Sequence, residues 1–129
     1  MSQIKIYGIA SVLKPMRSQL SEVLHGCVVE ALAYPKDKRA HRFFYLDHED
    51  FYSPEGRSES YIILEFNLFE GRSTASKKRL YSLIFDRFER VLGLRPQDVE
   101  IVLIESPAHN WGIRGLPGDE LRLNYKIDV

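Results

Sequence analysis

Arg72 is the side chain whose type and setting point most directly to chemistry. It lies in the run Gly71-Arg72-Ser73, directly before a segment with the apolar spacing of a helix. A planar guanidinium can hold a carboxylate through two parallel hydrogen bonds, and the amino end of a helix also attracts anions. We therefore predict that Arg72 binds a small anionic ligand; the alternative is a surface arginine near the start of a helix.

A second group of positive charges lies between residues 36 and 42 and consists of Lys36, Lys38, Arg39 and Arg42. Lys38 and Arg39 are candidates for holding the same anion from another side. A run of charges is also typical of a solvated loop. Both interpretations of this cluster remain open at the level of the sequence.

Trp111 is the only tryptophan, and the polar side chains of His109 and Arg114 lie close to it in the sequence. An aromatic wall with a few polar groups is typical of a small-molecule pocket. Contact with a small molecule is one interpretation of Trp111 and His109. The alternative is that Trp111 closes an edge of the core beneath the glycine-rich turn that follows it.

Other kinds of active site find little support in the sequence. The four histidines and one cysteine lack the spacing of HExxH or paired CxxC zinc sites. There is no GxSxG motif, and the glycines at 112, 115 and 118 are not followed by a helix pattern, as a Rossmann site requires. We expect neither a metal nor a cofactor.

The composition narrows the class of protein. The chain has 129 residues, enough for a single domain, and 18 basic residues balance 18 acidic ones. Zero net charge argues against a dedicated nucleic-acid binder. A single cysteine cannot form an internal disulfide, and we find neither a leader nor an apolar run of about 20 residues. We expect a cytoplasmic protein with no membrane contact.

Two segments have the spacing of amphipathic helices. Residues 13–33 carry apolar side chains at intervals of three and four, and Pro15 suits a first helical turn. A second stripe follows Ser73, which we predict to be the N-cap, and it ends at Gly93. These two helices must position Arg72 and the basic cluster.

Runs rich in Ile, Val, Phe and Tyr flank each helix and predict strands, which gives the order β-α-β-β-α-β. The segment 48–60 between the halves is more typical of a packed loop or a small hairpin than of a flexible linker. The alternation of Leu121, Leu123, Tyr125 and Ile127 predicts a short C-terminal strand. The four main predicted strands are Gln3–Ile9, Arg42–Leu46, Tyr61–Phe69 and Val99–Glu105.

The two halves also repeat each other. Eight apolar positions of the first half recur 60 residues later, which indicates an internal repeat of 2–47 and 61–106 followed by a C-terminal arm, 107–129. We predict one α+β domain, 1–129, with a four-stranded mixed sheet and both helices on one face. The other face of that sheet must then be covered.

A strand that ends in Glu-Gly-Arg-Ser and opens into a helix, LFEGRSTASKKR at 68–79, resembles the first strand-helix junction of 4-oxalocrotonate tautomerase. The whole chain resembles the fused, double-length members of the tautomerase superfamily, which include malonate semialdehyde decarboxylase. It is most similar to a bacterial subgroup that lacks the N-terminal proline. The matching residues are His25-Gly26, Pro35, Arg39, Gly71-Arg72-Ser73, Asp98-Val99, Glu105, Asn110-Trp111 and the run Pro107 to Gly115.

The resemblance implies a homotrimer in which the bare sheet faces pack around a threefold axis. It also implies an acid-base site built on an N-terminal proline, with arginines that bind the substrate carboxylate. Ser2 stands at the position of that proline, Arg72 matches the substrate arginine, and Glu70 replaces a second arginine. Lys38 falls where the decarboxylase has a catalytic aspartate. A small residue at position 2 favours removal of Met1, which would leave the Ser2 amine as a proton carrier.

We therefore expect a weak tautomerase, an isomerase of small keto or enol carboxylates. Ser2 and Arg72 are its candidate catalytic residues, and Arg72, Trp111, Lys38, Arg39 and His109 are its candidate substrate-binding residues. The alternative is a trimeric protein without enzymatic activity that binds small anions or acts as a scaffold. Ser2 and Glu70 favour the alternative, whereas Arg72 and Trp111 favour the enzyme.

Overall fold

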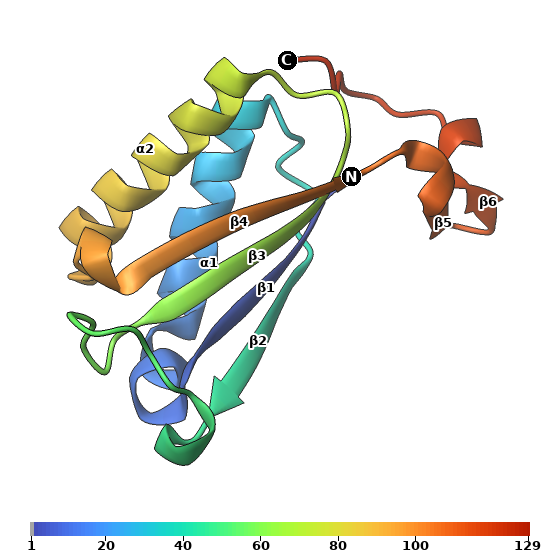
Figure 1. The fold of residues 1–129 in the computed structure, drawn as a ribbon. Coiled ribbons are helices and arrows are strands. Elements are labelled where there is room, and N and C mark those ends of the chain that lie inside the picture. Colours follow the sequence, from blue (N-terminus) through green and yellow to red (C-terminus); the bar gives the residue numbers. More distant parts are fainter. Residues whose placement is uncertain (1) are drawn as a thin grey trace.

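The computed structural model describes residues 2–129, so the expected removal of Met1 lies outside the described residues. Two helices cover one face of a four-stranded mixed sheet (Figure 1), as predicted. The strand order is β2-β1-β3-β4, with β1 parallel to β2, β3 parallel to β4, and β1 antiparallel to β3. The elements are β1 Ser2–Ile9, α1 Ala10–Leu32, β2 His41–Leu46, β3 Ile62–Phe69, α2 Thr74–Leu92 and β4 Val99–Ser106.

The two helices begin differently. Helix α1 starts at Ala10, three residues before its predicted start, so Pro15 lies inside the helix and the prediction of a first-turn proline is wrong. Helix α2 begins as predicted, because the Ser73 side chain accepts a hydrogen bond from the Ser76 N–H. It ends at Gly93, whose φ of 70° is the left-handed conformation that glycine adopts without strain.

The core lies between the sheet and the helices. Alternate residues of β1 and β3 point toward the helices and are fully buried, as period-two strands require. The helices contribute the apolar stripes that the sequence predicted, including the buried thiol of Cys27. The largest buried side chains include Phe66, Phe88, Ile4, Ile6, Leu13, Leu20, Leu24 and Leu64.

The opposite face of the sheet has no helix over it in the described chain. Tyr7 and Phe44 stack there with ring centroids 4.9 Å apart, and Val102 and Ile104 are each 44% exposed. Lys5 and Glu65 form an ion pair of 3.9 Å. A face that mixes apolar side chains with paired charges suits contact with another protein surface.

The loop between the two halves is anchored to the body, although most residues of 48–60 are exposed. Its Ser58 donates to Asp98 through both the backbone N–H, at 2.7 Å, and the hydroxyl, at 2.6 Å. Burial alone would raise the pKa of Asp98, but these bonds and Arg95 outweigh it and lower that pKa. The short helix η1, His48–Asp50, lies in this loop, and η2, Pro96–Asp98, precedes β4.

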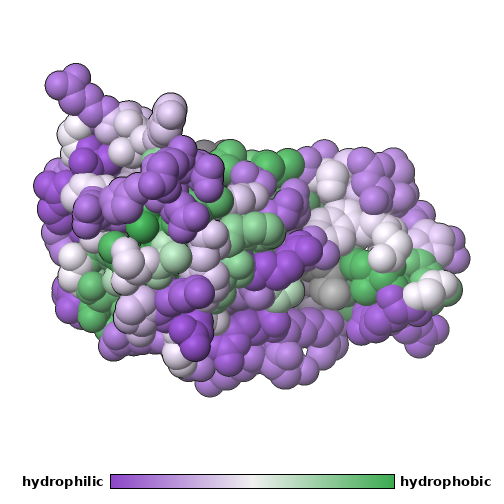
Figure 2. Space-filling view, turned by 90° about the horizontal axis from the view of Figure 1, so that it is seen from below, coloured by the Kyte–Doolittle hydropathy of each residue, from purple (hydrophilic) through white to green (hydrophobic). Residues whose placement is uncertain are grey.

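A small projecting unit follows β4. It contains the hairpin of β5, Gly112–Ile113, and β6, Leu116–Pro117, between the short helices η3, Ala108–Asn110, and η4, Gly118–Glu120. Figure 2 shows apolar surface over this end of the molecule, set among polar side chains. Among the described residues, no helix is both long and apolar enough to cross a membrane.

Residues 121–129, which we call the return segment, run back across the body from the hairpin (Figure 1). They form no strand in the described chain, so the predicted C-terminal strand is wrong. The predicted alternation nevertheless holds, because Leu121, Leu123, Tyr125 and Ile127 are partly buried and the residues between them are exposed. Side chains that face the body, rather than strand pairing, explain the pattern.

Candidate functional site

The topology brings the start of β1 beside the end of β3. The two strands are antiparallel, and Ser2 lies opposite Leu68 in their register. Arg72 follows a few residues later, in the turn that leads into α2. Two candidate residues that are 70 positions apart in the sequence therefore lie at the same end of the sheet.

Arg72 is buried, with only 5% of its surface exposed. Its Nη1 donates to the main-chain oxygen of Phe69 at 3.0 Å, whereas Nε and Nη2 are buried without a hydrogen-bond partner among the described residues. Burial lowers the pKa of Arg72, and the neighbouring Tyr125, Tyr34 and Glu105 oppose that shift. Unpartnered buried donors are costly, so this guanidinium is suited to receive an anionic ligand.

Tyr34 connects Ser2 to Arg72. The Ser2 nitrogen donates to the Tyr34 hydroxyl at 3.1 Å, and both residues are buried, at 8% and 5% exposed. Tyr34 also lies close enough to Arg72 to influence its pKa. The nitrogen at the start of β1, a phenol and a guanidinium thus share one buried region.

Tyr125 of the return segment covers this region. Its ring meets the Tyr34 ring edge to face at 5.1 Å between centroids, and the Lys38 Nζ lies 5.1 Å from the Tyr125 centroid. Burial and Tyr34 raise the pKa of Tyr125, and Arg72 opposes the shift. Lys38 is therefore at the border of the candidate site, where it contacts an aromatic face.

Trp111 supports the site through its contact with Phe69. Its indole N–H donates to the Ser106 hydroxyl at 2.9 Å, and its ring meets Phe69 edge to face at 5.1 Å. Phe69 is the residue whose main-chain oxygen anchors Arg72. His109 and Glu70 are both exposed, and His109 lines a hollow of the projecting hairpin with Trp111 and Leu116.

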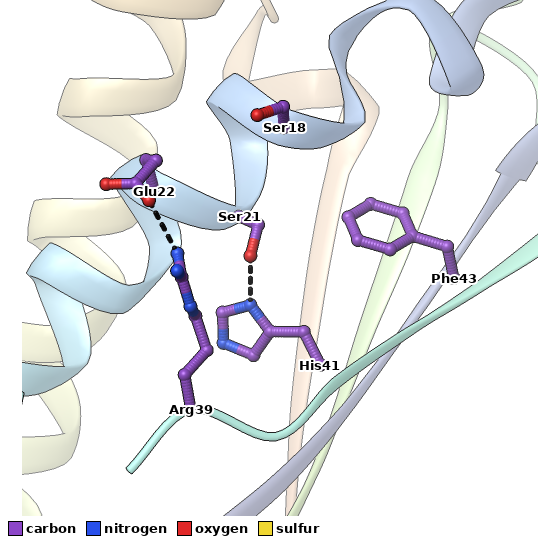
Figure 3. A pocket seen from close by; sticks show the side chains of 6 residues that line it. All are labelled: Ser18, Ser21, Glu22, Arg39, His41 and Phe43. Atoms are coloured by element: carbon purple, nitrogen blue, oxygen red, sulfur yellow. Dashed lines mark hydrogen bonds and ion pairs between the residues drawn. The ribbon is translucent and has the colours of Figure 1, made fainter. Parts of the chain in front are cut away.

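Arg39 lines a separate pocket between α1 and β2 (Figure 3), whose lining does not include Arg72. Its Nη1 donates to Glu22 Oε1 at 2.8 Å, so its charge is already paired. In the same pocket the Ser21 hydroxyl and His41 Nδ1 are 2.8 Å apart. Burial, His25 and Arg39 lower the pKa of His41 to about 4.

The structure therefore brings Ser2, Arg72 and Lys38 to one region. Trp111 contacts Phe69, which in turn binds Arg72. The structure does not bring Arg39 or His109 to that region. Sequence reasoning missed Tyr34, which lies just beyond the predicted helix 13–33, and it assigned Tyr125 only to the C-terminal alternation. The sequence contains one feature that could have indicated these two tyrosines: each has a lysine close to it in the chain.

Comparison with known proteins gives a consistent relationship. The family described as "Tautomerase enzyme" matches residues 38–114. The probable tautomerase YusQ of Bacillus subtilis (strain 168) is 31% identical over 101 residues, which cover 72% of this chain and 77% of the relative.

Two solved structures share the fold. Malonate semialdehyde decarboxylase superimposes with a TM-score of 0.81 at 23% identity, covering 92% of this chain and 99% of that chain. Native fused 4-OT gives a TM-score of 0.82 at 18% identity, covering 92% and 98%. The family match spans more than half of the sequence and the curated relative agrees with it, so this chain belongs to the tautomerase family.

Proposed function

We propose that this protein is a tautomerase that interconverts the enol and keto forms of small carboxylates. The observation that carries the proposal is the buried Arg72, with Nε and Nη2 free of partners among the described residues, beside the Tyr34 hydroxyl and the Ser2 nitrogen. These donors suit a carboxylate next to an oxygen that changes between hydroxyl and carbonyl. Membership of the tautomerase family supports this assignment.

The chemistry needs a proton carrier, and the Ser2 nitrogen is the candidate. In ketonization the enol O–H bond breaks and a C–H bond forms at the adjacent carbon. A terminal amine, whose ordinary pKa is about 7.7–8.0, can release one proton and take up the other near neutral pH. An amide cannot do this, so the proposed reaction requires that Met1 is removed.

The remaining residues hold the substrate. Arg72 binds the carboxylate and stabilises the negative charge that develops on the enol oxygen beside it. Tyr34 fixes the Ser2 nitrogen at 3.1 Å, and Lys38 adds positive charge at the border. Trp111 acts through Phe69, which positions Arg72.

The assembly that we propose is a homotrimer. Three fused 4-OT neighbours are described as wild-type trimers, two asymmetric and one symmetric. The open sheet face, with Tyr7, Phe44, Val102 and Ile104, offers the surface that such an assembly would cover. Multi-angle light scattering at micromolar concentration should give three times the mass of the chain; a monodisperse monomer would contradict this assembly.

The function is tested by ketonization of phenylenolpyruvate, with the N-terminus of the protein established by mass spectrometry. We expect turnover above buffer, and a loss of at least about 100-fold in kcat/KM in Arg72→Met, which keeps an aliphatic stem in the buried site. Arg90→Ala is the matched control, because Arg90 is an exposed arginine of α2 paired with Asp86.

Far-ultraviolet circular dichroism must show that both variants are folded. If correctly processed wild-type protein gives no turnover but binds the ligand, the tautomerase assignment is wrong, and a small-anion-binding protein takes its place. Equal rates for the wild type and Arg72→Met would also contradict the assigned role of Arg72.

A further inference from the structure

Three buried polar atoms around Arg72 have no partner in the described chain: Nε and Nη2 of Arg72 and the hydroxyl of Tyr125. Native proteins leave few such groups, because each one costs its lost hydration. We infer that Tyr125 is a ligand-binding residue that donates to the 2-oxo oxygen, and that the return segment is the wall of the site. This inference rests on the proposed function, to which it adds a specificity-determining residue and the segment that holds it.

The surroundings of Tyr125 are poor in acceptors. The Arg72 guanidinium and the Lys38 ammonium are donors only, so the Tyr34 oxygen, which also accepts the Ser2 N–H, is the acceptor that lies beside Tyr125. The Tyr125 hydroxyl makes no well-aligned hydrogen bond in the described chain, and a ligand oxygen would supply it with an acceptor. Two donors on Arg72 and one on Tyr125 match the three adjacent oxygens of a 2-oxo carboxylate.

The return segment is anchored on both sides of Tyr125. Before it, Leu121 and Leu123 face the body and are partly buried. After it, the Val129 main-chain oxygen accepts from the hydroxyls of Ser73, at 2.8 Å, and Ser76, at 2.7 Å. The Tyr125 ring is thus held in place before a ligand arrives, which reduces the ordering cost of binding.

Gly71 shows how closely the return segment approaches Arg72. Its φ is 132°, and a Cβ built on it would lie 2.9 Å from Ile127 Cγ2. A glycine is needed both for this backbone conformation and for the space that Ile127 occupies. The residue before Arg72 and the return segment therefore fit together closely.

The first experiment measures binding rather than turnover. Isothermal titration with phenylpyruvate should give a dissociation constant about 5- to 10-fold weaker for Tyr125→Phe than for the wild type, because one hydrogen bond is lost. 3-Phenylpropionate, which lacks the 2-oxo oxygen, should bind both proteins equally. Tyr52→Phe is the matched control, since Tyr52 is 89% exposed.

Unchanged phenylpyruvate binding in Tyr125→Phe overturns the inference. An equal loss for both ligands overturns the assignment of Tyr125 to the 2-oxo oxygen.

The second experiment tests the anchoring. Ser76→Ala removes one hydrogen bond to Val129 but keeps the backbone N–H that caps α2. We expect faster amide exchange in residues 121–129 and weaker phenylpyruvate binding, whereas Ser82→Ala, on an exposed position of α2, should change neither. Faster exchange with unchanged affinity would show that the return segment is not a wall of the site.

The inference and the proposed function fail separately. Weaker binding by Tyr125→Phe in a protein without turnover would keep the ligand site and reject the tautomerase. Turnover with the same kcat and KM in Tyr125→Phe, together with unchanged binding, would keep the tautomerase and reject the role of Tyr125.

Discussion

The two strand-to-helix junctions of this chain correspond in the repeat but differ in structure. Strands β1 and β3 each have eight residues and start 60 positions apart, and α1 and α2 end with the same offset. Helix α1 begins directly after Ile9, without a side-chain cap, whereas α2 begins only at Thr74. The second junction therefore has room for the turn 70–73, which contains Arg72.

The groups beside each junction also differ. The β3–α2 junction lies next to Ser2, at the start of β1, and the β1–α1 junction lies next to Ile62, at the start of β3. Ile62 follows Tyr61 within a continuous chain, so its nitrogen is an amide. At the position of Arg72, the first junction has Val12. One end of the sheet can therefore carry acid-base chemistry on an anion, and the other end lacks both groups.

Among the tests of this comparison, the largest expected effect concerns the proton carrier. Ser2→Pro, with Met1 removed, should raise kcat for phenylenolpyruvate ketonization by about 10- to 100-fold, because it supplies the secondary amine that the family resemblance implies. Ser2→Ala keeps a primary amine and should stay within about threefold of the wild type. A Ser2→Pro enzyme that is correctly processed and no faster would show that this end of the sheet does not use the nitrogen.

The next prediction compares the two β-α-β units through the pH dependence of stability. His41 lies at the start of β2, where the second unit has Ile101. Its pKa falls from 6.5 to about 4 on folding, so unfolding takes up a proton below pH 6.5, and stability is lost as the pH falls from 6.5 toward 4.

Between pH 7 and pH 5, we expect the free energy of unfolding to fall by about 1–2 kcal/mol more in the wild type than in His41→Ile. Urea unfolding at the two pH values measures this difference. His109→Gln, at an exposed position, should behave as the wild type. An identical loss in the wild type and His41→Ile would remove His41 as the cause.

The smallest effect compares two glycines. Gly71→Ala should lower the free energy of unfolding by about 1–2 kcal/mol, because it forces a positive φ on alanine and a contact with Ile127. Gly26→Ala, inside α1 with nothing within 4 Å of its added Cβ, should raise it by about 0.5–1 kcal/mol. Thermal unfolding of both variants gives the signs, and a neutral Gly71→Ala would argue against the close fit of the return segment.

Much of the fold follows from local patterns. The apolar stripes and the cap at Ser73 predicted the helices, and the repeat predicted the mixed sheet with both helices on one face. The predicted start of α1 was three residues too late, because the helix includes residues 10–12, which precede the apolar stripe. The C-terminal strand was wrong because alternation reports which side chains face the body and not whether the backbone pairs.

The candidate site was less predictable. Arg72 was found because it lies directly before a predicted helix, whereas Tyr34 and Tyr125 are 91 positions apart in the sequence and meet only in the folded chain. Arg39 was assigned to the site from its charge and from the family resemblance, but in the structure it is paired with Glu22 of α1. Charge type is visible in a sequence, and the direction of a side chain is not.

The claim that one end of the sheet is the site is tested most directly by a crystal structure with bound phenylpyruvate. We expect its carboxylate oxygens within about 3 Å of Nε and Nη2 of Arg72, and its 2-oxo oxygen facing Tyr125. Ligand bound at the other junction, in the pocket that includes Ile9, Ser11 and Asp47, with Arg72 left unoccupied, would contradict the account.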